Sequence, residues 1–384
     1  MIYFDNNATT SIDPSVLAEM LPFLKEQYGN PSSAYSFGKR VARAIEHARE
    51  QVAALLGCEP SEILFTSCGT ESDNTALQSA LTVDQDRRHI ITSKVEHSAI
   101  IKHAEALARR GYEVTWLDVD AKGFIDLSQL EDAIRPDTAV VSLMWANNET
   151  GVLFPIEEAA EICRKKQTIF HTDAVQAVGK IPIKLNTIPI QFLSLSGHKL
   201  HGPKGVGALY VNRRARFFPF LIGGGQENKR RGGTENTASI VALGKAAELA
   251  AELIQEEDRF VRDLRDTFER EAVQRIPGVT VNGDTERRLP NTTSLSIEGI
   301  DSEALLMILD QQGVCCSAGS ACTTGALEPS HVLRAMGLSN EQARASLRFS
   351  FGHLNTMEEV NRGLEILTRA VKKLRELTPG VLAA

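Results

Sequence analysis

Short apolar runs rich in β-branched residues alternate with longer amphipathic stretches from about residue 60 to residue 211. This alternation is typical of βαβ units, which build a mainly parallel sheet with helices on both faces. Several runs are apolar almost throughout, as expected for strands that are covered on both sides. The expected strands cover residues 63–65, 89–92, 113–119, 138–145, 168–172, 190–196 and 205–211. We therefore expect an α/β fold with one large, doubly wound, mainly parallel seven-stranded sheet.

The pattern changes after about residue 235. Residues 235–275 contain no proline and are rich in Ala, Leu, Glu and Arg, so they predict one long helix or two consecutive helices. Further on we expect short β-branched runs, a helix from Ser302, a strand at 347–351 and a terminal helix at about 357–377. These elements predict a smaller α+β unit. Our division of the chain assigns residues 15–252 to the large domain, and residues 1–14 and 253–384 to the small domain.

Composition narrows the kind of protein. Hydrophobic residues make up 42% of the 384 residues, enough for a large core, so wholesale disorder is excluded. The net charge of −7 argues against a nucleic-acid partner held by overall charge. No apolar run approaches the roughly 18–20 residues of a membrane span, and the N-terminus does not resemble a secretory signal. Six cysteines suit a reducing compartment. We therefore expect a cytoplasmic protein with neither a membrane nor a nucleic-acid partner.

A lysine follows the expected strand 190–196, in the segment Ser-Gly-His-Lys at residues 196–199. Open α/β sheets bind ligands at the carboxyl ends of their strands, so Lys199 is expected at a ligand site. Burial there lowers the pKa of an amine and lets it attack an aldehyde. An ordinary surface lysine in a turn of glycine and proline is the alternative interpretation.

Asp173 leaves the preceding expected strand at the same edge. A carboxylate in such a place needs a positive partner, because its desolvation is otherwise costly. The protonated pyridine nitrogen of pyridoxal phosphate is one such partner. An aspartate that caps a turn or a helix is the alternative interpretation.

Two helix starts lie at this edge as well. Residues 66–72 lead from a strand into a helix through Gly69 and Thr70, where free N–H groups and a hydroxyl can hold a phosphate. The same segment fits a capping box that binds nothing. His97 opens the next helix, where an imidazole can stack on an aromatic cofactor and transfer protons. A histidine at a helix start without a ligand is the alternative there.

Small residues surround Cys322 and predict a mobile loop at about 315–328, because they offer little volume for packing. A cysteine on such a loop is accessible and can act as a moving nucleophile. The alternative, a buried inert cysteine, fits Cys58 and Cys163 better. The usual C-x-x-C spacing of zinc ligands is absent from the neighbouring thiols, Cys315, Cys316 and Cys322.

Arg348 interrupts an apolar strand. Its planar guanidinium can form two parallel hydrogen bonds with a carboxylate, so an amino-acid substrate is one candidate partner. A structural ion pair with an acidic side chain of the protein is the other. The sequence pattern alone supports both interpretations of this arginine.

Taken together, these motifs resemble those of the pyridoxal-phosphate-dependent cysteine desulfurases, a family of the class-V aminotransferase type. The resemblance covers nearly the whole chain and keeps the order of the family's motifs. The Ser-Ala-Cys context of Cys322 resembles that of the long-loop group, and the chain is closest to its NifS type. The matching segments are residues 5–10, 28–33, 147–151, 172–176, 196–199 and 319–323.

The resemblance implies fold type I of the pyridoxal-phosphate-dependent transferases and a role for each matching residue. Lys199 would bind the cofactor aldehyde covalently, Asp173 would pair with the pyridine nitrogen, and His97 would stack on the ring and act in catalysis. Gln176 would bond the ring hydroxyl, and Asn148 and Arg348 would hold the substrate carboxylate. The cofactor phosphate would be held by Gly69, Thr70, Ser196, His198 and, from the neighbouring subunit, Thr234. Asn148 also counts among the cofactor-binding residues.

The implied reaction removes sulfur from L-cysteine, leaving L-alanine and a persulfide on Cys322. A free thiol is only a few per cent ionised near neutral pH, so a proton acceptor must assist, and His97 is the candidate. The family forms homodimers with shared sites. It passes sulfur to an iron–sulfur scaffold protein of the NifU or IscU kind or to another acceptor. No resident metal is implied, although Cys322 is also a candidate iron–sulfur ligand.

Two other interpretations stay open. Another fold-type-I enzyme, such as a selenocysteine lyase or an aminotransferase, would share Lys199 and Asp173, but an aminotransferase needs no thiol on a small-residue loop. A non-enzymatic carrier of sulfur or metal would use the six cysteines as ligands. The sites follow one another in the order that one cofactor pocket requires, and this order favours the desulfurase.

Overall fold

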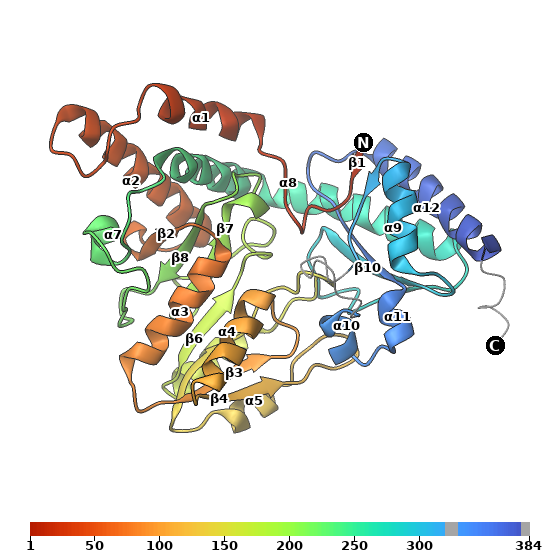
Figure 1. Cartoon of the computed structure of the whole chain (residues 1–384), viewed down its shortest axis with the longest axis horizontal. Helices are drawn as coiled ribbons and strands as arrows, with labels where there is room; N and C mark the ends of the chain where they lie inside the picture. Colours follow the sequence, from red (N-terminus) through yellow and green to blue (C-terminus); the bar gives the residue numbers. More distant parts are fainter. Residues whose placement is uncertain (319–328, 378–384) are drawn as a thin grey trace.

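The computed structural model describes residues 1–318 and 329–377 (Figure 1). Its larger part is built on a seven-stranded sheet in the order β2-β8-β7-β6-β5-β3-β4. Strand β8 is antiparallel to both neighbours, and all other pairs are parallel. The strands are β2 (Ile63–Thr66), β3 (His89–Ser93), β4 (Glu113–Leu117), β5 (Thr138–Ser142), β6 (Ile169–Asp173), β7 (Phe192–Ser196) and β8 (Gly207–Val211). The mainly parallel seven-stranded sheet is confirmed.

Strand β5 ends earlier than the sequence predicts, at Ser142 rather than residue 145. Beyond Ser142 two further N–H groups still bond to β6: Leu143 donates to the His171 carbonyl (3.1 Å) and Trp145 to that of Asp173 (2.8 Å). The apolar run therefore continues beside β6 after the regular strand has ended. It brings the following residues to the edge of the sheet where the expected site lies.

Helices cover both faces of this sheet. Successive residues of a strand point to opposite sides, so Ile90 and Val140 pack against α3 (Gly69–Val83) and α4 (Ser98–Arg109). Their neighbours Ile91 and Val141 belong to the larger cluster on the other side. Helices on that side include α2 (Ser36–Leu56), α5 (Leu127–Ala133), α6 (Ile156–Lys165) and the first half of α8 (Thr237–Arg275).

Two N-terminal helices were not predicted. Helix α1 (Pro14–Lys25) begins after Asp13, whose carboxylate accepts a hydrogen bond from the Ser15 N–H (2.7 Å). Helix α2 packs along α8, and the two backbones come close at Gly244, where an added Cβ would lie 2.5 Å from the Ala48 Cα. Glycine is therefore required at this crossing. Neither helix contains a motif that points to chemistry.

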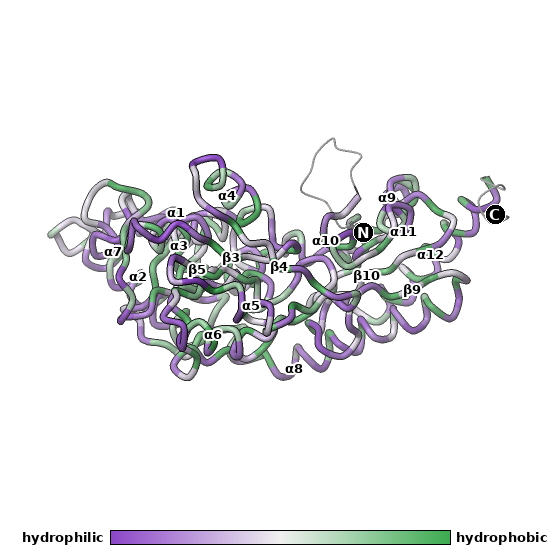
Figure 2. The backbone as a smooth tube through the Cα atoms, turned by 90° about the horizontal axis from the view of Figure 1, so that it is seen from below, coloured by the Kyte–Doolittle hydropathy of each residue, from purple (hydrophilic) through white to green (hydrophobic). Residues whose placement is uncertain are grey.

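Helix α8 is a single helix of 39 residues, one of the two forms expected for this segment. Leu243 in its first half packs under the large sheet, and Phe268 in its second half lies in a second apolar cluster. Figure 2 shows α8 running along both parts of the molecule. The helix therefore connects the two cores through one continuous element.

The second core belongs to the smaller part, which the C-terminal third of the chain and the N-terminus build together. Phe4 is fully buried there, with its ring 4.8 Å from that of Phe351 and 5.6 Å from that of Phe268. The elements are β1 (Ile2–Tyr3) paired with β11 (Val314–Cys315), the antiparallel β9 (Val279–Val281), β10 (Thr292–Ile297) and β12 (Ser346–Ser350), and helices α9 (Ser302–Gln311), α10 (His331–Ala335), α11 (Asn340–Arg344) and α12 (Met357–Leu377). The domain boundaries given above stay a proposal.

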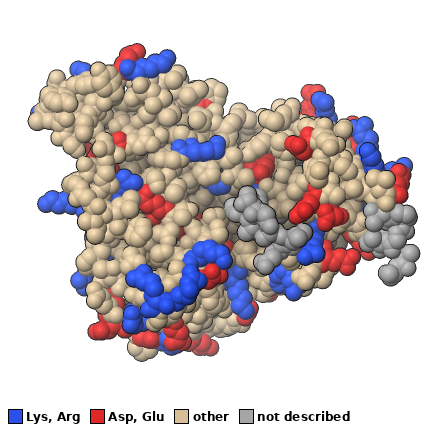
Figure 3. All heavy atoms as spheres, viewed as in Figure 1, with Lys and Arg blue, Asp and Glu red and all other residues tan. Residues whose placement is uncertain are grey.

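Two surface properties follow from the sequence pattern. In residues 1–318 and 329–377, no helix has the length and low charge needed to cross a lipid bilayer. On the face drawn in Figure 3, Lys and Arg gather over α4, and acidic and basic side chains are otherwise interspersed. No single sign of charge dominates that face, in line with the modest net charge of −7.

Candidate active site

A cavity of about 390 Å³ lies at the carboxyl ends of β6 and β7. The starts of α3 and α4, the segment after β5, the N-terminal segment and β12 complete its walls. Ten of the sequence-predicted residues line it: Gly69, Thr70, His97, Asn148, Asp173, Gln176, Ser196, His198, Lys199 and Arg348. The structure adds Asn7, Ala8, Cys68, Asp73, Met144, Ala146 and Val175. Residues that are far apart in the sequence therefore share one pocket.

Lys199 is presented by the short 3-10 turn η2 (Gly197–Lys199), which follows β7. Its Nζ donates to the carbonyl oxygens of Asn7 (2.5 Å) and Ala8 (2.7 Å). The turn is tight because the Gly197 N–H bonds to the Val206 carbonyl (3.0 Å), at the point where the chain returns towards β8. The two carbonyl oxygens hold the amine in the pocket by hydrogen bonds. These hydrogen bonds can break when the nitrogen forms a covalent bond to a ligand.

Two buried carboxyl groups face this pocket. Asp173 ends β6, and its Oδ1 accepts a hydrogen bond from the Val175 N–H (2.9 Å). Burial raises the pKa of Asp173, and burial together with the nearby Asp173 raises that of Asp73 on α3. The Asp73 Oδ1 has no hydrogen-bond partner within the described chain. His171 lies 3.5 Å from it, but burial lowers the pKa of this ring to about 3, so it stays neutral.

This acidic wall favours a ligand that brings a positive group. Ionised carboxylates away from water are stabilised by a cation at hydrogen-bonding distance. A protonated pyridine nitrogen is such a group, and pairing it with Asp173 keeps the ring electron-withdrawing. The donor set and the orphaned Asp73 oxygen therefore fit the pyridine end of pyridoxal phosphate.

The start of the 15-residue helix α3 fits the phosphate end. The first N–H groups of a helix have no partner within it, and the helix dipole favours an anion there. Gly69 leaves the space open, because an added Cβ would lie 2.8 Å from the Val175 Cγ2. Ser196 and His198 join this wall from the end of β7 and the turn after it. The residues present thus fit both ends of the cofactor, with Lys199 in the same pocket.

His97 caps α4 in the same pocket. Its Nδ1 accepts a hydrogen bond from the Ala99 N–H (3.2 Å), so the neutral ring carries its proton on Nε2. The preceding Glu96 is fully buried, and its Oε1 accepts from the Ser93 hydroxyl (2.7 Å) and the Met144 N–H (3.0 Å). Burial raises the pKa of Glu96 to about 8. Glu96, the residue that precedes His97, is therefore a protonated carboxyl group near neutral pH.

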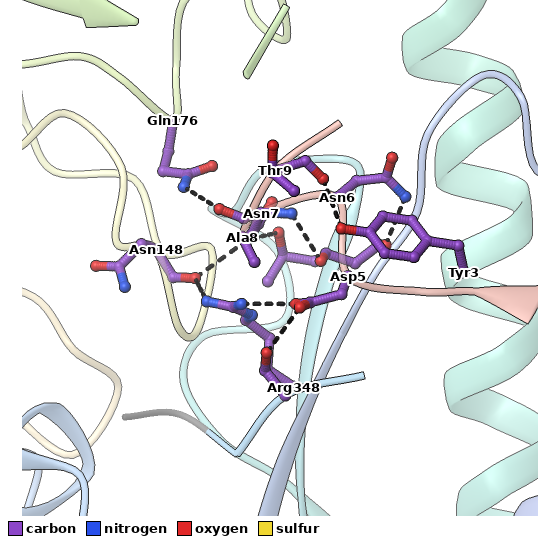
Figure 4. Close-up of polar contacts among 12 residues, drawn as sticks. Tyr3, Asp5, Asn6, Asn7, Ala8, Thr9, Asn148, Gln176 and Arg348 are labelled. Carbon is purple, nitrogen blue, oxygen red and sulfur yellow. Dashed lines mark hydrogen bonds and ion pairs between the residues drawn. The ribbon is translucent and has the colours of Figure 1, made fainter. Parts of the chain in front are cut away.

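Asn7 joins the N-terminal segment to both parts of the molecule (Figure 4). Its carbonyl oxygen accepts from Gln176 Nε2 (3.0 Å) as well as from Lys199. Its side-chain amide donates to the Asn148 carbonyl (3.2 Å) and to the Thr292 hydroxyl on β10 (2.8 Å). The pocket is therefore built around a short segment that both sheets hold in place.

Arg348 has a partner within the chain. Its Nη2 lies 2.8 Å from Asp5 Oδ1, and its Nη1 donates to the Asn148 carbonyl (2.9 Å), as Figure 4 shows. Asp5 also accepts from the Ser317 hydroxyl (2.9 Å). The structural ion pair, one of the two alternatives for this arginine, is therefore present. Arg348 nevertheless lines the pocket, and its Nε has no hydrogen-bond partner in the part of the chain that is described.

Two predicted residues are not among the described residues that line this pocket. Thr234 is exposed and lines a separate cavity with Ser67, Glu227 and Arg231. Cys322 falls in residues 319–328, outside the described residues, as does most of the loop expected at about 315–328. Within residues 1–318 and 329–377, no group of three or more His, Cys, Asp or Glu side chains is arranged to hold a metal ion.

Four of the other five cysteines differ from an activated thiol. Burial raises the pKa of Cys58 and of Cys163 to about 12, and it raises that of Cys316 as well. The pKa of Cys315 is raised by burial and by nearby acidic groups. Raised values leave less thiolate at neutral pH, so these four thiols are poor nucleophiles. The inert interpretation of Cys58 and Cys163 agrees with this environment.

Sequence reasoning missed several residues that shape the site. Asp5, Asn7 and Ala8 lie in a segment singled out for its resemblance, without a role. Asp73 follows Gly69 by four residues, about one turn of α3. The helical period could therefore have indicated that both residues lie on the same side of the helix. Glu96 carried no separate signal, because its burial depends on β5 and the segment after it.

Comparison with known proteins agrees with this geometry. The family model described as Aminotransferase class-V matches residues 2–362. A cysteine desulfurase of Nostoc sp. (strain PCC 7120 / SAG 25.82 / UTEX 2576) is 51% identical over 381 residues, covering 99% of this chain and 95% of that one. Cysteine desulfurase NifS of Azotobacter vinelandii is 51% identical over 379 residues, covering 98% and 94%. A solved NifS-like protein superimposes with a TM-score of 0.91 at 39% identity, covering 97% of this chain and 99% of that one.

Fold and pocket together define an enzyme of fold type I that depends on pyridoxal 5′-phosphate. The similarity to the named relatives extends over almost the whole length of both chains. The chain belongs to the cysteine desulfurase family of the class-V aminotransferases.

The substitution Glu96→Gln tests the buried acid beside His97. In the folded protein Glu96 holds its proton up to about pH 8, whereas in the unfolded chain it loses the proton near the ordinary value of 4.5. Unfolding between these values releases a proton, so the wild type loses stability as the pH rises, by up to about 1.4 kcal/mol per pH unit. We expect its free energy of unfolding to fall relative to Glu96→Gln from about pH 6 to about pH 8 in urea titrations of cofactor-loaded protein.

A matched control is Glu365→Gln, on the exposed side of α12. This substitution should give the same difference from the wild type at every pH in the range. A difference between wild type and Glu96→Gln that does not change with pH would show that Glu96 is ionised in the folded protein.

Proposed function

We propose that the enzyme transfers the sulfur of L-cysteine to Cys322 and releases L-alanine. The observation that carries the proposal is the meeting of Lys199, Asp173 and Arg348 at one pocket, in a chain 51% identical to cysteine desulfurases. An amine for the aldehyde, a buried acid for the ring and a guanidinium for a carboxylate are the groups that this chemistry needs. Each comes from a different element of the fold.

The bound cofactor supplies an electron-withdrawing ring, which labilises bonds at the carbon atoms of an attached amino acid. Lys199 would hold the cofactor, and its amine is the group in the pocket that would move a proton from the substrate α-carbon. Asp173 would keep the ring nitrogen charged, Gln176 would bond the ring oxygen, and His97 would lie against the ring. Gly69, Thr70, Ser196 and His198 would hold the phosphate.

Arg348 and Asn148 position the substrate carboxylate. Asp5 fixes one side of the guanidinium, at 2.8 Å, and Nε has no partner within the described chain, so it is the donor that would remain for a substrate carboxylate. The Asn148 carbonyl is engaged by Arg348 and Asn7, so the asparagine backbone is held still beside the pocket. Orientation of the substrate therefore rests on groups that are already fixed before it binds.

Cys322 attacks the substrate sulfur as a thiolate. A new S–S bond forms, the substrate C–S bond breaks, and its electron pair stays on the carbon side, where protonation gives alanine. One L-cysteine and one thiol thus yield one L-alanine and one persulfide. His97 is the candidate acceptor for the Cys322 proton; to accept it on Nε2, the ring would have to move its own proton to Nδ1 and give up the hydrogen bond from the Ala99 N–H.

A homodimer completes the site. Thr234 lies outside the Lys199 pocket of its own chain, yet the resemblance gives it a role on a cofactor phosphate. Phe220, Leu221 and Ile222 expose apolar side chains near it in sequence, and Ile222 is 88% exposed. A second copy of the chain would cover these side chains and bring Thr234 to the partner's cofactor.

The persulfide would be passed on in the cytoplasm to an iron–sulfur scaffold protein of the NifU or IscU kind. Transfer to another sulfur acceptor would require the same step: Cys322 would have to carry the sulfur out of the pocket first. We include in this proposal that Cys322 would bind iron–sulfur material only while sulfur is being transferred. A selenocysteine lyase is the second candidate function, since it would use the same pocket.

The substitution Cys322→Ala tests the sulfur acceptor. It removes the attacking thiol, so we expect alanine formation from L-cysteine to fall by about two orders of magnitude or more. The visible absorption of the bound cofactor should be unchanged, because Lys199 is intact. Cys58→Ala, which removes a half-buried thiol outside the pocket, is the matched control and should keep the wild-type rate. Wild-type alanine formation in Cys322→Ala would refute the role of this thiol.

Light scattering tests the homodimer. We expect a molar mass twice the chain mass of 42.0 kDa for the cofactor-loaded protein. Thr234→Ala should leave this mass unchanged and weaken cofactor retention in both subunits. A single-chain mass for fully active enzyme would show that no second copy contributes to the site.

A further inference from the structure

Lys180 lies four residues beyond Gln176, in the turns that follow β6. Its Nζ donates to Gln176 Oε1 (2.9 Å) and to the Gln176 carbonyl oxygen (3.1 Å). On its other side a second cavity of about 280 Å³ separates the N-terminal segment from α8, and both Lys180 and Lys199 line it. Lys180 is half-buried, and the catalytic scheme above gives it no part.

Two hydrogen bonds bear on how the Gln176 carboxamide is turned: the one from Lys180 to Oε1 and the one from Nε2 to the Asn7 carbonyl oxygen. A lysine ammonium has only donors, so the atom that faces it must be the amide oxygen. The amide nitrogen then faces the opposite way, where it donates to the Asn7 carbonyl oxygen (3.0 Å). That carbonyl oxygen also accepts from Lys199. Gln176 is therefore presented to the cofactor pocket as a donor and not as an acceptor.

The Asn7 carbonyl favours the same orientation when Lys180 is neutral, because a carbonyl oxygen can only accept. Burial, followed by the charges of Lys199 and Arg348, lowers the pKa of Lys180 to about 7. A neutral amine still has two N–H groups, which matches the two oxygen atoms of Gln176 that it bonds. The titratable and charged groups that act on Lys180 or feel its charge are Lys199, Arg348, His198 and His201.

We propose that Lys180 is a positioning residue of the cofactor site, which fixes the Gln176 carboxamide with its nitrogen towards the ring oxygen of the cofactor. The inference rests on the proposed role of Gln176. A donor at that oxygen stabilises its negative charge and weakens its hold on the proton of the Lys199 nitrogen. The cofactor-loaded protein therefore loses this proton at a lower pH than it would with a freely turning amide.

The test is a pH titration of the visible absorption band of the cofactor-loaded protein without substrate. In Lys180→Met the Gln176 oxygen loses its donor, the Asn7 carbonyl alone is left to orient the amide, and a nearby charge is lost, so the pH midpoint of the band should rise by about one unit. Lys180→Arg keeps the donors, and the neighbouring cavity has room for the larger side chain, so its midpoint should stay near the wild-type value. Lys184→Met, an exposed lysine nearby in sequence, should not shift the midpoint.

Gln176→Leu separates positioning from charge alone. If Lys180 acts through Gln176, Lys180→Met should shift the midpoint less in the Gln176→Leu background than in the wild type. An equal shift in both backgrounds, or no shift in either, would overturn the inference. Failure of the wild-type protein to form any visible band with the cofactor would instead refute the proposed function, so the two outcomes are distinguishable.

Discussion

The Asn7 carbonyl oxygen is the point on which the site depends. It accepts from Lys199 (2.5 Å) and from Gln176 (3.0 Å), and the Asn7 side chain bonds Asn148 and Thr292. Three distant parts of the chain are thereby brought together: the N-terminus, the ends of the large sheet and the small antiparallel sheet. Removing this contact would take one acceptor from the Lys199 amine and one from the Gln176 amide at the same time. The buried ring of Phe4, three residues earlier, anchors the segment in the smaller core.

Carboxyl groups are buried in and near the pocket, and their burial lowers the stability of the fold. Asp73, Glu96 and Asp173 are all buried, and burial raises the pKa of each. Such groups reduce stability unless a ligand compensates them. A cofactor with a charged ring nitrogen and an anionic phosphate offers this compensation at two ends of the same cavity. The buried carboxyl groups therefore lower the stability of the fold, and they are retained because the reaction uses them.

Local patterns explain which features the sequence predicted. Strand alternation, the Ser-Gly-His-Lys turn and the start of α3 each depend on neighbouring residues, and the structure contains all three. The ion pair of Arg348 with Asp5 joins residues 343 positions apart, which no periodicity encodes. The contact of Lys180 with Gln176 spans four residues, yet its importance depends on the cavity behind it. Such contacts follow from tertiary packing, so sequence patterns indicate their residues without their partners.

The most direct test of the account is the position of the covalent bond to the cofactor. Reduction of the cofactor-loaded protein with borohydride would fix the bond, and digestion with mass spectrometry would locate it. We expect the pyridoxyl mass on the peptide that contains Lys199 and on no other. A label on another peptide, or no label in protein that has bound the cofactor, would contradict the central role of Lys199.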